Sequence, residues 1–376
     1  MLIKKIVSVI LFSLIFSFTV LSASFPEISG EGAVLLNADT KEVIFEKNKD
    51  KKLSMASTTK IMTSLLAIES GRLQCVVTAK KDVSCEGTAI GIKKGDSFTL
   101  ETLVYAMLLE SGNDAAILTA EYLAGSEADF SALMNEKAKE IGMTSTNFVT
   151  ASGLDSEEHY TTAYDMALLG AYAIKNPAFR KICSAKNYSA DYISPDISAT
   201  YSNHNKLLDS YEGVFGIKTG FTKKSGRCLV SCCEKNDITL VAVTLNAGDD
   251  WNDHIKMYDY GYSVARSEKL NISIPDKIRV YGSEKSYIKT KLTDTLVIAD
   301  EKDNFSYEIS LKKWVYAPVS TGDVIGYIYV KKNGHLIKQS EIAASENADI
   351  LDSEAEPQFS FLYKLKQLFS NRLNKN

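Results

Sequence analysis

The sequence has only four histidines and six cysteines in 376 residues, and neither type is arranged as a metal site requires. The histidines are scattered, no two cysteines form a C-x-x-C pair, and no cysteine stands near a histidine at zinc-ligand spacing. These absences argue against a metalloenzyme, and no cofactor is expected. Surface or hydrogen-bonded structural roles are predicted instead for His159, His204, His254 and His335.

An excess of charge of one sign is also missing. The chain has 43 basic and 47 acidic residues and a formal net charge of −4. A nucleic-acid-binding protein would usually carry a basic excess on one face, so nucleic acid is not expected as a partner. With 45% hydrophobic residues the chain is expected to fold, and its length suits two domains plus tails.

The N-terminus lacks an apolar run long enough to span a membrane comfortably. Lys4 and Lys5 precede an uncharged, mostly apolar run of 16 residues, 6–21. As a helix this run would be about 24 Å long, against a hydrocarbon core of about 30 Å. Small residues at 22–24 offer a cleavage site. We therefore predict a signal peptide over 1–24 and export of the chain, with an uncleaved anchor as the alternative.

The cysteines allow two interpretations. In an exported protein Cys75 and Cys85 are the nearest pair that could close a loop as a disulfide. The favoured interpretation is that the cysteines are small buried hydrophobic residues, as free cysteines usually are. Cys228, Cys232 and Cys233 support it, because they lie in an apolar run typical of a strand.

Residues 25–270 mix helical and strand patterns and are predicted to form one domain. A strand pair joined by Asn-Ala-Asp-Thr is predicted over 32–36 and 43–45. Helical spacing of apolar residues predicts helices at 54–69, 100–123 with an interruption at 111–112, 132–141, from Thr162 onward, and 255–264. Apolar runs predict strands at 217–219, 228–232 and 238–245.

Residues 271–345 are predicted to form a small all-β domain. Strands are expected at 277–280, 296–298, 305–311 and 324–330, with Asn333-Gly334 as a hairpin turn. Alternating Phe305, Tyr307, Ile309 and Leu311 indicate a half-buried strand, and Tyr327 and Tyr329 are expected to be exposed, as for partner contact.

Two segments follow this domain. Residues 346–357 are acidic and are predicted to be a linker. Residues 358–376 place their apolar side chains on one helical face and their cations elsewhere, which predicts an amphipathic helix at the membrane surface. A terminal helix docked on the protein itself is the alternative.

A serine and a lysine stand three residues apart at the start of a predicted helix, in Ser57-Thr58-Thr59-Lys60. Residues at i and i+3 share a helix face about 5–6 Å apart at Cβ, so the lysine amine can reach the serine hydroxyl. A serine becomes a good nucleophile when a base takes its proton, and a lysine does this when its pKa is lowered. The first helical turn also offers free backbone N–H groups for an oxyanion.

Two further motifs follow. Ser111-Gly112-Asn113 interrupts a helical pattern and offers a hydroxyl and an amide for proton relay and substrate positioning, although such a tripeptide alone is most often a turn. Lys218-Thr219-Gly220 offers a glycine that lets a substrate backbone approach and two side chains that can bind a carboxylate. Taken alone, it is equally an edge strand with a solvated lysine.

The three motifs together, in this order and about 50 and 105 residues apart, are far more specific than each alone. The sequence resembles the low-molecular-mass penicillin-binding proteins of the D-alanyl-D-alanine carboxypeptidase family, over about residues 28–345. The longer strings that carry the resemblance are Ser-Gly-Asn-Asp-Ala-Ala at 111–116, Gly-Leu-Asp at 153–155, His-Tyr-Thr-Thr at 159–162 and Gly-Ile-Lys-Thr-Gly-Phe-Thr at 216–222.

The resemblance implies an α+β fold. A penicillin-binding/β-lactamase-like transpeptidase domain, with a five-stranded antiparallel sheet flanked by helices plus a helical cluster, would precede the small all-β domain. It also implies a serine-type D-Ala-D-Ala carboxypeptidase that acts on peptidoglycan stem peptides, with β-lactams as covalent inhibitors. Such an enzyme would work at the outer face of the bacterial cytoplasmic membrane or in the cell wall. The resemblance implies that Ser57 is the nucleophile and Lys60 its general base, and that Ser111 and Asn113 assist proton transfer and substrate positioning. Lys218 and Thr219 would bind the substrate carboxylate, in a substrate-binding stretch that continues through Gly220 and Phe221. The backbone N–H groups of Ser57 and Phe221 would bind the oxyanion.

One departure from the family pattern concerns carboxylate binding. Relatives often carry an arginine about eleven residues before the glycine that matches Gly261, whereas this chain has Asp249-Asp250-Trp251-Asn252-Asp253 there. Carboxylate binding is therefore expected to rest more on Lys218 and Thr219, and Trp251 is given no role beyond packing.

Three other functions fit the sequence less well than the carboxypeptidase does. A β-lactamase is disfavoured because no E-x-x-L-N string follows Asn113. Cleavage of cross-links by a D,D-endopeptidase is the closer alternative. A non-catalytic wall-binding protein is disfavoured because the four polar residues of the motifs are all present.

Overall fold

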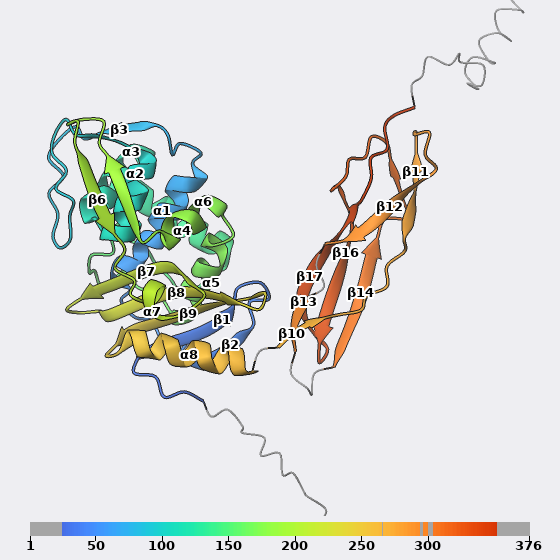
Figure 1. Ribbon diagram of the computed structural model, residues 1–376. Coiled ribbons are helices and arrows are strands. Elements are labelled where there is room, and N and C mark those ends of the chain that lie inside the picture. The colour runs from blue at the N-terminus through green and yellow to red at the C-terminus, as the bar shows by residue number, and fades with distance from the viewer. Residues whose placement is uncertain (1–24, 265, 294–295, 300–303, 352–376) are drawn as a thin grey trace, which may run out of the picture.

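The computed structural model describes residues 25–264, 266–293, 296–299 and 304–351 (Figure 1). The predicted signal peptide at 1–24, the end of the predicted acidic linker and the predicted helix at 358–376 lie outside these residues. The structure has a sheet with helices on both faces, a cluster of further helices, and a separate C-terminal β domain, so the predicted fold class is confirmed.

The central sheet has five strands in the order β2-β1-β9-β8-β7. Every neighbouring pair is antiparallel, and β7 forms one edge. The middle strands are covered on both faces, which explains why their sequences read as continuous apolar runs. The strands are β1 (Gly32–Asn37), β2 (Val43–Lys47), β7 (Val214–Thr222), β8 (Gly226–Lys235) and β9 (Ile238–Ala247).

Helices cover both faces of this sheet. Helix α8 (Asp250–Val264) packs on β8 and β9 from one side, where Met257 and Tyr258 are fully buried. Helix α5 (Ala163–Ala173) packs on the other side against β1, β8 and β9, and the helical cluster lies beyond it (Figure 1). The α5 N-terminus is capped by Thr162, whose hydroxyl accepts from the Asp165 N–H.

The helical cluster carries two of the three motifs. A 3₁₀ turn, η1 (Ala56–Thr59), leads into α1 (Lys60–Glu69), so the helix predicted at 54–69 begins as a tighter turn. The interruption predicted at 111–112 separates a π-helical turn, η2 (Ala106–Glu110), from α3 (Asn113–Ala124). The remaining helices of the domain are α2 (Leu100–Tyr105), α4 (Glu127–Ile141), α6 (Pro177–Ser184) and α7 (Leu207–Ser210). Two short strand pairs complete it: β3 (Val76–Thr78) pairs with β4 (Ser97–Thr99), and β5 (Asn187–Asp191) pairs with β6 (Ser198–Ser202).

The C-terminal domain is all β around its own core of Ile278, Ile288, Ile328 and Ile342 and their apolar neighbours. Its larger sheet has the strand order β14-β16-β17-β12-β11-β15, and β10 pairs with β13. The strands are β10 (Arg266–Lys269), β11 (Lys277–Tyr281), β12 (Tyr287–Leu292), β13 (Leu296–Ala299), β14 (Phe305–Leu311), β15 (Trp314–Tyr316), β16 (Val324–Lys332) and β17 (His335–Ala344).

Two expectations about this domain were wrong. Tyr307 and Ile309 are 42% and 38% exposed, because β14 is an edge strand that the core only partly covers. Tyr327 and Tyr329 are half-buried rather than exposed, since β16 is flanked by β14 and β17.

All six cysteines are free thiols, so the possible Cys75–Cys85 disulfide is absent. Cys183, Cys228, Cys232 and Cys233 are buried, as the favoured interpretation expected. That interpretation fails for Cys75, which is exposed, and for Cys85, which is half-buried, because both lie in loop segments outside the hydrophobic core.

Gly153 provides a test of how tightly the chain packs behind η1. Its φ is +89°, and an added Cβ would lie 2.0 Å from the Ala56 carbonyl oxygen. Gly153→Ala is expected to lower the free energy of unfolding by about 1–2 kcal/mol for the backbone conformation and roughly 1–3 kcal/mol more for the clash.

Gly71→Ala is the matched control for that substitution. Gly71 has a φ of +70° but nothing within 4 Å of its added Cβ, so only the backbone term applies. Urea unfolding of both variants measures the difference. Equal losses of stability would show that the contact with Ala56 is not restrictive.

Candidate active site

Ser57 and Lys60 meet where η1 passes into α1. The Lys60 Nζ lies 2.9 Å from the Ser57 Oγ, as the i and i+3 spacing predicts. Ala56, the residue before the serine, has a φ of +47°, a conformation that non-glycine residues rarely adopt. Strain of this kind persists only where the surroundings hold it, and it fixes the direction in which Ser57 leaves the backbone.

The Lys60 amine is enclosed by oxygen atoms. Besides Ser57, its Nζ donates to the Asn113 Oδ1 at 2.6 Å and to the Ser152 carbonyl at 2.7 Å. The side chain has no exposed surface. Burial, helped by the charge of Lys218, holds the pKa of Lys60 well below its usual range.

This geometry suits a neutral amine as well as an ammonium group. A neutral amine has two N–H donors and one lone pair. If the donors go to Asn113 and Ser152, the lone pair faces the Ser57 hydroxyl and can accept its proton. The arrangement therefore has the parts of a nucleophile with an adjacent base.

The second motif meets the first at Lys60 and at the cavity that Ser57 lines. Asn113 begins α3, and its Nδ2 donates to the Glu86 carbonyl at 2.6 Å while its Oδ1 accepts from Lys60. Ser111 lies at the end of η2 with a φ of +64° and lines the same cavity as Ser57. Asp114 accepts from the N–H groups of Ile90, Gly91 and Ile92, which fastens the segment over the site.

The third motif lies on β7, the edge strand of the sheet. Gly220 stands against the nucleophile, because an added Cβ would be 3.0 Å from the Ser57 backbone nitrogen. Thr219 is half-buried, and Phe221 is 66% exposed at the rim. The structure thus brings Thr219, Gly220 and Phe221 to the cavity that Ser57 lines.

Lys218 is 1% exposed, so the solvated edge-strand lysine considered above is excluded. Its Nζ donates to the Thr219 carbonyl at 2.9 Å. Burial lowers the pKa of Lys218 to about 7, although the charge of Glu110 opposes the shift. Lys218 therefore titrates near neutrality.

The cavity has a volume of about 470 Å³. Sequence reasoning missed several residues that line it. Arg227 had a detectable signal: it stands nine residues after Lys218, directly before the strand predicted at 228–232. The lining residues are Ser57, Thr88, Ser111, His204, Thr219, Gly220, Phe221, Arg227, Asp250 and Trp251.

Two histidines have structural roles, as predicted. The His159 Nδ1 accepts from the Val149 N–H, which leaves the proton on Nε2 for the Thr59 hydroxyl at 2.8 Å. Burial lowers the pKa of His159 to about 4, so the ring stays neutral and its hydrogen bond to Thr59 holds the end of η1 in place. His254 is fully buried between Ser231 and Thr244, and burial lowers its pKa to about 3.

Two family models match this chain. Residues 19–249 match the one described as D-alanyl-D-alanine carboxypeptidase. Residues 255–349 match the one described as penicillin-binding protein 5, C-terminal domain. D-alanyl-D-alanine carboxypeptidase DacF of Bacillus subtilis is 31% identical over 335 residues, which cover 84% of this chain and 85% of that protein.

Solved structures show the same similarity. D-alanyl-D-alanine carboxypeptidase DacD from Francisella tularensis has a TM-score of 0.61 and 26% identity, over 87% of this chain and 95% of that one. Penicillin-binding protein D2 from Listeria monocytogenes, solved in its ampicillin-bound form, has a TM-score of 0.57 and 29% identity, over 63% of this chain and 100% of that one.

Proposed function

The chain belongs to the D-alanyl-D-alanine carboxypeptidase family, and from this premise we propose that it removes the terminal D-alanine of peptidoglycan stem peptides through an acyl-enzyme on Ser57. The observation that carries the choice of nucleophile is the 2.9 Å approach of the fully buried Lys60 amine to the Ser57 hydroxyl. No metal or cofactor takes part in the proposed reaction.

In the first half of the reaction Ser57 attacks the carbonyl carbon of the penultimate D-alanine. Its proton passes to the Lys60 Nζ, and the tetrahedral oxyanion binds to the backbone N–H groups of Ser57 and Phe221. The C–N bond then breaks, and D-alanine leaves with a proton delivered to its nitrogen. Ser111 and Asn113 assist, Asn113 by holding the Lys60 amine and Ser111 by relaying the proton at the cavity wall.

In the second half water attacks the ester of the acyl-enzyme. Lys60 again takes a proton, now from water, and the Ser57 oxygen leaves and recovers its proton.

The substrate carboxylate is bound by Thr219 and Lys218, while Gly220 lets the substrate backbone approach β7. A β-lactam acylates the same serine, because its strained amide resembles the cleaved bond. The ester that it forms with Ser57 is hydrolysed slowly, so the β-lactam acts as an inhibitor.

The first experiment measures D-alanine release from a peptide that ends in D-Ala-D-Ala. The wild-type chain from residue 25 is expected to release D-alanine, and Ser57→Ala is expected to lose at least about 10³-fold of that rate. Ser57→Ala should fold normally, which a melting curve checks. Equal release by both proteins would exclude Ser57 as the nucleophile.

The pH dependence of the reaction follows from the two buried lysines. Lys60 must be neutral to accept a proton, so activity rises as pH passes its lowered pKa. Lys218 must be charged to attract the carboxylate, so kcat/KM is expected to decline as pH rises through about 7. A bound carboxylate stabilises the charged form of Lys218, so kcat should decline only at higher pH.

Lys218→Arg tests this assignment, because an arginine stays charged throughout. Its kcat/KM is expected to lose the alkaline decline. A wild-type kcat/KM that stays constant up to about pH 9 would contradict the role of Lys218.

Peptidoglycan lies outside the cytoplasmic membrane, so the chain acts there. Among the described residues, no helix combines the length and the apolar character needed to cross a bilayer. We also propose that residues 358–376 lie on the membrane surface as an amphipathic helix, which rests on their sequence pattern.

A surface of the C-terminal domain supports membrane contact. Leu351 donates its N–H to the Gly282 carbonyl at 2.8 Å, so the chain leaves the domain beside β11. Exposed aromatic and basic side chains gather on the neighbouring strands, a composition that suits an anionic lipid surface. They are Lys277, Arg279, Tyr281, Tyr287, Trp314 and Tyr316.

Sedimentation with vesicles of phosphatidylglycerol and phosphatidylcholine tests the proposal. The chain from residue 25 is expected to sediment with anionic vesicles, and truncation after Leu351 should remove most of the binding. Replacing Trp314 and Tyr316 by serine in the full chain should weaken binding several-fold. Replacing the exposed Ile193 and Ile197, which lie in the other domain, is the control. Unchanged binding after truncation would contradict the role of 358–376.

A further inference from the structure

One guanidinium group lines the active-site cavity, and it comes from the strand next to β7. Arg227 lies near the start of β8 and pairs directly with Phe221 across the two strands. Directly opposed residues of an antiparallel pair project on the same side of the sheet. The Arg227 side chain is 42% exposed and shares the cavity with Ser57, Thr219 and Gly220.

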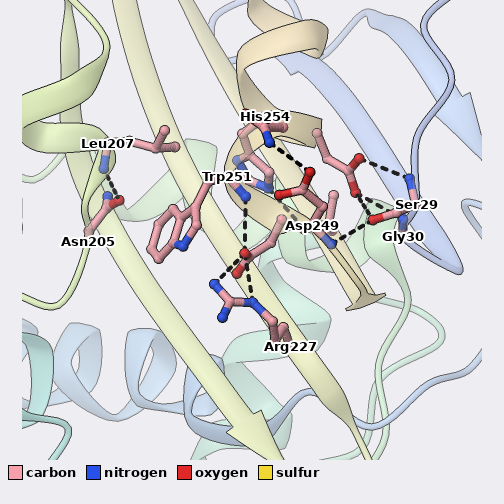
Figure 2. Close-up of polar contacts among 12 residues, drawn as sticks. Ser29, Gly30, Asn205, Leu207, Arg227, Asp249, Trp251 and His254 are labelled. Carbon is pink, nitrogen blue, oxygen red and sulfur yellow. Dashed lines mark hydrogen bonds and ion pairs between the residues drawn. The ribbon is translucent and has the colours of Figure 1, made fainter.

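A buried carboxylate holds this guanidinium in place. The Nε and Nη2 of Arg227 donate to the same Asp250 oxygen, Oδ1, at 2.8 and 2.5 Å (Figure 2). The Asp250 side chain is only 3% exposed and stands at the start of α8. The backbone N–H of Trp251 donates to the same oxygen at 3.0 Å, so the acceptor is itself fixed.

The Trp251 ring forms another side of the arginine site. The guanidinium carbon lies 5.5 Å from the ring centroid, within the range of a cation–π contact. Figure 2 shows the indole between Arg227 and the Asn205–Leu207 segment. The ring restricts the rotamers of Arg227, which reduces the entropy lost when a ligand binds.

The guanidinium keeps donors for a ligand. It has five N–H groups, and the two bonds to Asp250 use two of them. The other three are enough for a two-pronged contact with a carboxylate, the geometry that arginine favours. Because Asp250 binds one edge only, the pair orients the cation without closing the site.

Arg227 is also better suited than Lys218 to attract an anion over the whole physiological pH range. A guanidinium stays charged at every physiological pH. Lys218, with a pKa lowered to about 7 by burial, is only partly charged near neutrality. Arg227 therefore keeps its charge over the pH range in which Lys218 loses it, and the Asp250 carboxylate balances part of that charge.

We propose that Arg227, held by Asp250 and Trp251, binds the free terminal carboxylate of the substrate beside Thr219 and so makes the cavity select chain ends. The proposal rests on the proposed function and deepens it. In the main chain a free carboxylate exists only on the C-terminal residue, so Arg227 favours removal of a terminal D-alanine over cleavage of an internal peptide bond. It also supplies the cation that the Asp249–Asp253 segment lacks.

The test pairs two variants with two substrates. The substrates are a D-Ala-D-Ala peptide with a free C-terminal carboxylate and the same peptide as its C-terminal amide. Arg227→Gln is expected to lower kcat/KM for the carboxylate peptide roughly 10- to 100-fold, mainly through KM, because a charged hydrogen-bonded contact is lost. Its kcat/KM for the amide should stay within about threefold, so the wild-type preference for the carboxylate disappears.

Arg180→Gln is the matched control. Arg180 also pairs with a carboxylate, that of Glu234, but it does not line the cavity, and the variant should keep the wild-type preference. Arg227→Lys is the second test variant. It keeps the charge but loses the two-pronged geometry, and a partial loss of preference is expected.

The outcomes separate two kinds of failure. If wild type cleaves neither peptide, the proposed function itself fails. If wild type prefers the carboxylate and Arg227→Gln keeps that preference, or loses both substrates equally while its melting curve is normal, the role of Arg227 is wrong. If Arg227→Gln does not fold, Arg227→Lys decides by the same comparison, and an unchanged preference overturns the proposal.

Discussion

Burying the Lys60 amine beside Ser57 is the requirement on which the rest of the site depends. A lysine that is cut off from water is costly unless its hydrogen bonds are satisfied, and three oxygens satisfy them here. Those oxygens come from η1, from the first residue of α3 and from the Ser152 loop. The helical cluster must therefore close around one nitrogen atom, and the same closure holds the pKa of Lys60 well below its usual range, as the proposed role of general base requires.

Close backbone contacts keep this closure rigid. Gly153 packs against the Ala56 carbonyl and Gly220 against the Ser57 nitrogen, so two segments distant in sequence lie directly against η1. Ala56 and Ser111 both hold positive φ angles in the walls of the site. Such strain is tolerated where the surrounding fold fixes the chain, and here it directs side chains that must meet within hydrogen-bond distance.

The sequence predicted the residues whose positions depend on local spacing. Ser57 and Lys60 stand three residues apart at the start of a predicted helix, and the interruption at Ser111 and the strand at Lys218 follow from short patterns. Arg227, Asp250 and Trp251 were not predicted as a group, because their meeting depends on how α8 packs on β8. The strand pair β5 and β6 and the edge position of β14 were missed for the same reason, since tertiary packing decides them rather than local pattern.

The most direct test of the account is to locate the adduct of a penicillin on the chain. After reaction and trypsin digestion, the drug's mass should appear on the peptide that spans residues 53–60, which contains Ser57. Lys60→Met should form the same adduct far more slowly, because the hydroxyl has lost its base. An adduct on Ser111 or another residue, or undiminished acylation of Lys60→Met, would contradict the pairing of Ser57 with Lys60.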